Sequence, residues 1–188
     1  GKEECWFVVN ADPGAVLGIG TTKPLSSTEL RAASESGEIE HLMDWKPVKA
    51  GDFFYIPAGT VHAIGAGVTL VEVQQYADIT YRLYDYGRPR ALHLDDGVDV
   101  SNAEPYADAR SGNICAGPLI VDSTHFHLRH VTDAGQLSDI PIDAQLALIP
   151  VEGKVFVEGD GVVVGDCLIF NALPRIVFGD GAKLLIVW

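Results

Sequence analysis

The stretch Gly51-Asp-Phe-Phe-Tyr-Ile-Pro57-Ala-Gly59-Thr-Val-His62 decides the fold. Gly51 suits the positive φ of a turn before a strand, and the apolar run 53–56 is typical of a buried strand. Pro57 and Gly59 then favour a tight bend. The bend would aim the His62 imidazole at a fixed point, which a metal ligand requires because zinc–imidazole distances are held near ~2.0–2.1 Å.

The composition is that of an ordinary globular protein, with 47% apolar and 21% charged residues in a chain of 188. The net charge of −13 argues against nucleic acid or an anionic membrane surface as a partner, because both require clustered Lys and Arg. No apolar run approaches the ~18 residues of a membrane span, and no secretory signal pattern opens the chain. A phosphorylated small molecule, which needs only a few local cations, remains compatible with this charge.

Cysteine usage indicates the compartment. Cys5, Cys115 and Cys167 are an odd number without close spacing, so a disulfide framework is not expected. We therefore expect a reducing, cytoplasmic environment.

Short β-type segments recur in two runs, with a loop-like or linker segment over 101–118 between them. Many short strands with regular turns favour a jelly roll or sandwich, and two runs predict two such units. The predicted strands are 5–9, 15–19, 52–56, 68–75 and 80–85 in the first run, and 126–131, 144–150, 154–158, 161–164, 167–170, 175–178 and 183–188 in the second.

One helical insert is expected over about 26–44, with Ser27 or Thr28 as the N-cap. Gly37 should divide it into two short helices, which would form a lid or a packing element. The apolar face would consist of Leu30, Ala33, Ile39, Leu42 and Met43.

A faint internal repeat relates the two runs. Gly51-Asp52 and Gly165-Asp166 each precede an apolar segment. If these glycines are aligned, His62 falls opposite Ile176, so a metal-capable side chain in the first unit corresponds to a hydrophobic one in the second.

The opening stretch resembles the second motif of the cupin superfamily, Gly-x5-Pro-x-Gly-x2-His. It departs at Ala66, where cupins often have Asn. The resemblance implies a mainly β fold of two cupin-type jelly-roll units with the short helical insert. We expect a first unit over 1–100 that carries the site, a linker over 101–117 and a second, degenerate unit over 118–188.

A wider resemblance narrows the family. The segments 1–6 (Gly-Lys-Glu-Glu-Cys-Trp), 51–65, 72–75 and 80–87 (Thr-Tyr-Arg-Leu-Tyr-Asp-Tyr-Gly) resemble type I mannose-6-phosphate isomerases. The likeness is strong over 1–100 and loose beyond 112. It implies a zinc-dependent aldose–ketose isomerase that interconverts mannose 6-phosphate and fructose 6-phosphate through an enediol(ate).

The resemblance also implies a zinc site. The family holds zinc with a Gln-x-His pair, the Glu of a Lys-x-Glu segment and the His after Pro-x-Gly; Glu4 matches that Glu and His62 matches that His. Neither Gln74 nor Gln75 is followed by a His at the required spacing. In the family the Gln-x-His pair lies upstream of Lys-x-Glu, so its counterpart would precede Gly1.

Three further residues are predicted to act in catalysis. Arg82 matches an arginine that the family uses near the reacting carbons, and a cation there would stabilise an enediolate oxygen. Lys2 matches a pocket lysine that would bind phosphate or relay protons, and Glu72 would orient a ligand or shuttle protons. The alternatives are a salt-bridging Arg82, a solvated Lys2 and a hydrogen-bonded structural Glu72.

Structural roles are expected for the other candidate metal and phosphate sites. His125 and His127 would share a strand face as a metal pair, but His130 breaks the phase, so a surface or interface role is expected. The segment 88–90 (Arg-Pro-Arg) is expected to be a solvated turn rather than a phosphate site. The segment 65–67 (Gly-Ala-Gly) is expected to be a turn, since no helix follows it closely.

Two other functions stay open at this point. A non-catalytic sugar-binding or regulatory cupin module would explain the missing Gln-x-His pair. Another cupin enzyme, such as an epimerase or a dioxygenase, is a third alternative, although a dioxygenase would prefer more His ligands than this sequence offers.

Overall fold

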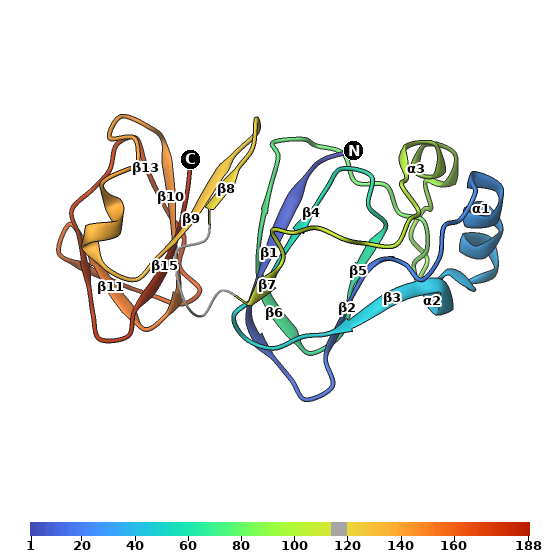
Figure 1. The fold of residues 1–188 in the computed structure, drawn as a ribbon, viewed down its shortest axis with the longest axis horizontal. Helices are drawn as coiled ribbons and strands as arrows, with labels where there is room; N and C mark the ends of the chain where they lie inside the picture. Colours follow the sequence, from blue (N-terminus) through green and yellow to red (C-terminus); the bar gives the residue numbers. More distant parts are fainter. Residues whose placement is uncertain (114–119) are drawn as a thin grey trace. The chain divides into compact units, whose positions relative to one another are not determined.

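The computed structural model describes residues 1–113 and 120–188, which fall into two compact units, Gly1–Gly112 and Asn113–Trp188. Both units consist of antiparallel β-sheets with few helices (Figure 1). The prediction of a mainly β protein is therefore confirmed.

The first unit contains two antiparallel sheets. One has the strand order β6-β1-β4-β7, and the other has the order β3-β2-β5. The strands are β1 (Glu4–Ala11), β2 (Val16–Thr21), β3 (Met43–Pro47), β4 (Asp52–Ile56), β5 (His62–Ile64), β6 (Val68–Gln74) and β7 (Gly112–Asn113).

The core of this unit lies between its two sheets. Alternate residues of β1, Trp6 and Val8, meet Leu17 and Ile19 of β2 and Ile56 of β4, and all five are nearly inaccessible to solvent. This follows from the two-residue period of a strand, which turns every second side chain to the same face. Glu4 at the start of β1 and His62 at the start of β5 lie together beside this apolar core.

The helical insert forms α1 (Ser27–Ser36) and α2 (Ile39–Leu42). As predicted, the chain turns at Gly37, which has a left-handed φ of 82°. The predicted N-cap was wrong: Ser26 caps α1, because its hydroxyl accepts from the Glu29 N–H while the Glu29 carboxylate accepts from the Ser26 N–H in a capping box. The insert also ends earlier than predicted, since 43–44 belong to β3.

The segment 80–85 is not a strand, contrary to prediction, but the start of a loop that closes on itself. The Arg82 N–H donates to Nδ1 of His93, and the His93 N–H donates back to the Arg82 carbonyl. Tyr86 and Gly87, with φ values of 54° and 72° in the left-handed region, then turn the chain. A helix that the sequence analysis missed, α3 (Leu94–Val100), follows the loop.

The three helices lie together at one end of the first unit (Figure 1). They share a second apolar cluster, which joins Leu30 and Ala33 of α1 to Val98 of α3. The residues 101–112, which the sequence analysis assigns to a linker, fall within this unit, and Ala103 is buried in the same cluster. The remainder of the predicted linker, with Cys115, lies mostly outside the described residues.

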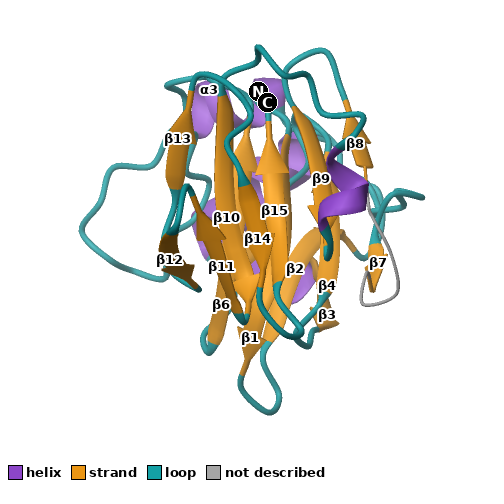
Figure 2. Ribbon diagram, turned by 90° about the vertical axis from the view of Figure 1, so that its left-hand side faces the viewer, coloured by secondary structure: helices purple, strands orange, loops and turns teal. Residues whose placement is uncertain are grey.

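The second unit also has two antiparallel sheets, with strand orders β13-β10-β15-β9-β8 and β12-β11-β14 (Figure 2). Its core is apolar and includes Leu146, Leu148 and Ile186. The elements are β8 (Ile120–Asp122), β9 (His127–Val131), the 3-10 turn η1 (Ala134–Leu137), β10 (Leu146–Glu152), β11 (Lys154–Val157), β12 (Asp160–Val163), β13 (Leu168–Phe170), β14 (Ile176–Phe178) and β15 (Lys183–Val187).

Within the described part of the chain, no helix is both long and apolar enough to cross a membrane. Cys5 is a buried free thiol and Cys167 an exposed one.

Candidate functional site

His62 is positioned by the bend that the opening motif predicts. Gly59 has a φ of 86°, and a Cβ at this position would lie 2.8 Å from the Val100 carbonyl oxygen. Only glycine allows both this conformation and this close approach. The Asn102 N–H donates to the Gly59 carbonyl at 2.7 Å. These contacts fix the bend before β5, whose first residue is His62. 

The hydrogen bonding of His62 defines which ring nitrogen faces the site. Nδ1 lies 2.8 Å from the Thr60 carbonyl oxygen, and a carbonyl can only accept, so Nδ1 carries a proton. In the neutral ring, Nε2 then holds the free lone pair. Nε2 lies 3.4 Å from Oε1 of Glu4, so the two atoms that could coordinate a metal ion face one another.

Glu4, the first residue of β1, is a buried carboxylate with only 1% of its surface exposed. Its Oε1 accepts from the indole N–H of Trp6 at 3.0 Å. Its Oε2 lies 3.2 Å from Nζ of Lys2, but it accepts no hydrogen bond of good geometry within the described residues. A buried charge is costly unless it is paired, so this carboxylate favours a cation beside it.

The Glu4–His62 pair suits one edge of a zinc site. Zinc bonds of ~2.0–2.1 Å in a tetrahedron place neighbouring donor atoms roughly 3.3–3.4 Å apart, close to the observed 3.4 Å. The fit is partial, because the described ranges 1–113 and 120–188 contain no group of three His, Cys, Asp or Glu side chains that could hold a metal. Cys5 offers no thiolate, since burial and then the Glu4 charge raise the pKa of its thiol.

Lys2 and Glu72 complete a polar cluster with Glu4. Nζ of Lys2 lies 3.9 Å from Oε1 of Glu72 and donates to the amide oxygen of Gln74. Oε2 of Glu72 accepts from the indole N–H of Trp6 at 3.2 Å. The cluster thus places one cation and two carboxylates beside the His62 imidazole.

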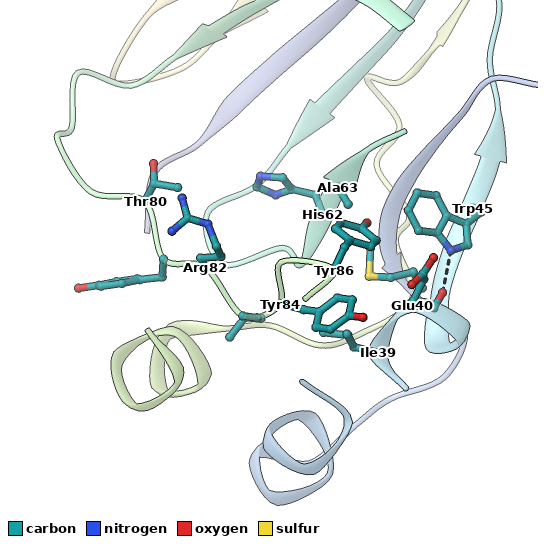
Figure 3. Close-up of a pocket in the computed structure, with 12 residues that line it drawn as sticks. Ile39, Glu40, Trp45, His62, Ala63, Thr80, Arg82, Tyr84 and Tyr86 are labelled. Carbon is teal, nitrogen blue, oxygen red and sulfur yellow. Dashed lines mark hydrogen bonds between the residues drawn. The ribbon is translucent and has the colours of Figure 1, made fainter. Parts of the chain in front are cut away.

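Two cavities meet at His62. One, of about 240 Å³, is lined by Lys2, Glu4 and Glu72. The other, of about 200 Å³, is lined by Arg82 together with aromatic side chains (Figure 3). His62, Thr80 and Tyr81 line both cavities.

The loop after β6 positions Arg82. Its Nη1 donates to the Ala91 carbonyl at 3.1 Å. Asp85 and Arg90 hold the loop closed through paired hydrogen bonds, one of them 2.6 Å long, and the Arg90 hydrogen bonds lower the pKa of the Asp85 carboxyl. The structure therefore brings Lys2, Glu4, His62 and Glu72 to one cavity and Arg82 to the adjoining one.

The sequence analysis missed several residues around these cavities. In the sequence, Trp6 stands out only as part of the segment 1–6, although its position two residues after Glu4 puts both on one strand face. Glu40 and Trp45 line the second cavity, and the Trp45 indole N–H donates to the Glu40 carbonyl at 2.8 Å (Figure 3). Tyr84 and Tyr86 line it as well, with ring centroids 5.1 Å apart.

The remaining candidates have structural surroundings. His125 precedes β9, so it does not share a strand face with His127, and the predicted geometry of that pair was wrong. Nδ1 of His127 lies 2.9 Å from Asp122, and its ring stacks on Trp188, whereas His130 is buried. The segment 88–90 is a turn whose Arg90 pairs with Asp85.

Comparison with known proteins shows similarity over part of the chain. No family model matches the chain. It is 49% identical to the mannose-6-phosphate isomerase of Streptococcus mutans over 106 residues, which are 53% of this chain and 33% of that protein. The chain thus matches about a third of the length of that relative.

Solved structures of mannose 6-phosphate isomerases also resemble the chain. The mannose 6-phosphate isomerase of Bacillus subtilis matches with a TM-score of 0.74 and 28% identity, over 100% of this chain and 65% of that one. A zinc-bound mannose 6-phosphate isomerase shares the fold, with a TM-score of 0.66 and 15% identity over 100% of this chain and 66% of that one. The chain is therefore a homologue of the type I mannose-6-phosphate isomerases, with sequence similarity over about half of its length.

Proposed function

We propose that these residues form part of a zinc-dependent isomerase that interconverts mannose 6-phosphate and fructose 6-phosphate, built on two cupin-type jelly-roll units of which the second is degenerate. The observation that carries the proposal is the 3.4 Å approach of His62 Nε2 to Glu4 Oε1, with Nδ1 held by the Thr60 carbonyl. This arrangement supports a shared divalent ion.

In the proposed reaction, a base removes the proton from the carbon beside the carbonyl, an enediol(ate) forms, and the proton returns to the neighbouring carbon. Glu72 and Lys2 line the cavity beside His62, where they would carry protons. Arg82, on the adjoining cavity, would stabilise the developing oxyanion. Zinc held by Glu4 and His62 would supply Lewis acidity and a template for the sugar oxygens.

A non-catalytic sugar-binding module is the second candidate. The observation that favours it is that Glu4 and His62 are two donors, whereas zinc sites need at least three protein ligands. The isomerase proposal therefore requires further donors, for which the resemblance implies a Gln-x-His pair.

The test is His62→Ala in the complete protein, assayed for zinc content and for isomerisation in a coupled assay. Removing one of two donors should lower zinc affinity at least 100-fold and abolish isomerisation. Thr69→Ala, an exposed change on β6, is the matched control. Unchanged zinc content and activity in His62→Ala would refute the proposal, and zinc-independent sugar binding without turnover would favour the second candidate.

A further inference from the structure

Trp6 touches three residues of the proposed site although it lines neither cavity. It is fully buried. Its indole N–H is shared between Oε1 of Glu4 at 3.0 Å and Oε2 of Glu72 at 3.2 Å. Its ring also meets the His62 ring edge-on, with centroids 5.2 Å apart.

These contacts close a ring of four side chains. Trp6 joins one oxygen of each carboxylate, and the Lys2 ammonium lies beside the other oxygen of each, 3.2 Å from Glu4 and 3.9 Å from Glu72. Each carboxylate thus accepts a hydrogen bond from the Trp6 indole at one oxygen and has the Lys2 ammonium beside the other.

The strand register explains how this ring forms. Trp6 on β1 lies directly opposite Glu72 on β6, and Glu4 precedes Trp6 by two residues on the same face. In the second unit the corresponding pair is hydrophobic: Leu148 on β10 lies opposite Ile186 on β15. Core packing at this place therefore does not require an N–H donor.

We propose that Trp6 is a positioning residue that holds Glu72 against Glu4 and braces the His62 ring. The importance of this arrangement for zinc rests on the proposed function. Residues that orient metal ligands typically change metal affinity or activity 10–100-fold when they are altered.

The hydrogen bonds are tested on the metal-free chain by the indole N–H resonances of its three tryptophans. Trp6→Phe assigns the Trp6 signal. Glu72→Ala, at a side chain that is 37% exposed, should shift that signal and leave those of Trp45 and Trp188 in place. Thr69→Ala is the control, and an unmoved Trp6 signal in Glu72→Ala would overturn the proposal.

A second experiment compares the zinc affinity of Trp6→Phe with that of Phe7→Leu, a substitution of a buried residue on the opposite face of β1. Zinc affinity by calorimetry should fall 10–100-fold in Trp6→Phe and remain at the wild-type value in Phe7→Leu. Equal affinities in the two variants would overturn the positioning role. If the wild-type chain takes up no zinc, Glu4 and His62 do not hold the ion without further donors, and the indole shift still decides whether Trp6 holds Glu72.

Discussion

The two units repeat one succession of six strands. In the first, β1 lies between β4 and β6, and β2 between β3 and β5; in the second, β10 lies between β13 and β15, and β11 between β12 and β14. Aligning Gly51 with Gly165 superposes the ranges of β5 and β14 in sequence. The repeat noted in the sequence is therefore matched by the strand order.

The units differ at the residues of the proposed site. Ile176 in the second unit corresponds to His62 in the first. Leu146 corresponds to Glu4, because Leu146 pairs with Phe170 as Glu4 pairs with Ile56. Both hydrophobic residues are buried. Because a buried carboxylate costs free energy that an apolar side chain does not, the buried Glu4 is not explained by stability, and the difference supports a functional role.

The largest effect is expected when a carboxylate is placed at the position of the second unit that corresponds to Glu4. Leu146→Glu would bury a carboxylate without a partner and should lower the free energy of unfolding by about 5 kcal/mol. Ile169→Glu, at a side chain that is 60% exposed, is the control and should cost less than about 0.5 kcal/mol. Chemical denaturation measures both, and similar losses would show that the second core tolerates charge.

A smaller effect is expected at the bend that aims His62. Gly59→Ala forces a side chain into a left-handed conformation 2.8 Å from the Val100 carbonyl, and should cost about 3 kcal/mol. Gly14→Ala has a similar φ of 84° but no atom within 4 Å, so it should cost about 1 kcal/mol. Equal losses in thermal unfolding would mean that the close approach is unimportant.

The smallest effect is expected from the loop that carries Arg82. The Asp85 carboxyl has a pKa below its ordinary 3.8 because Arg90 donates to it. The folded state therefore binds the proton less readily, so this stabilisation is fully present above about pH 4 and is lost as the pH falls through the lowered pKa. Asp85→Asn should be less stable than wild type at pH 7, and the difference in thermal midpoint should shrink towards pH 2.5; a constant difference would contradict this origin.

Much of the fold was readable from the sequence, because period-two apolar patterns and Gly or Pro turns are local signals. The range of β4 was predicted to the residue, and the division of the insert at Gly37 was correct. The loop after β6 was not readable, since Thr80, Tyr81 and Tyr84 are residue types common in strands. Only the more distant Arg90 and His93 close the loop. The role of Trp6 depends on cross-strand pairing with Glu72, which no local pattern reports.

The most direct test of the shared ion is a zinc titration of the chain followed by the ring nitrogen resonances of its six histidines. The account predicts that Nε2 of His62 shifts while Nδ1 keeps its proton, and that Glu4→Gln weakens this response at least 10-fold. A response confined to His125 or His127, or an unchanged His62 response in Glu4→Gln, would contradict it.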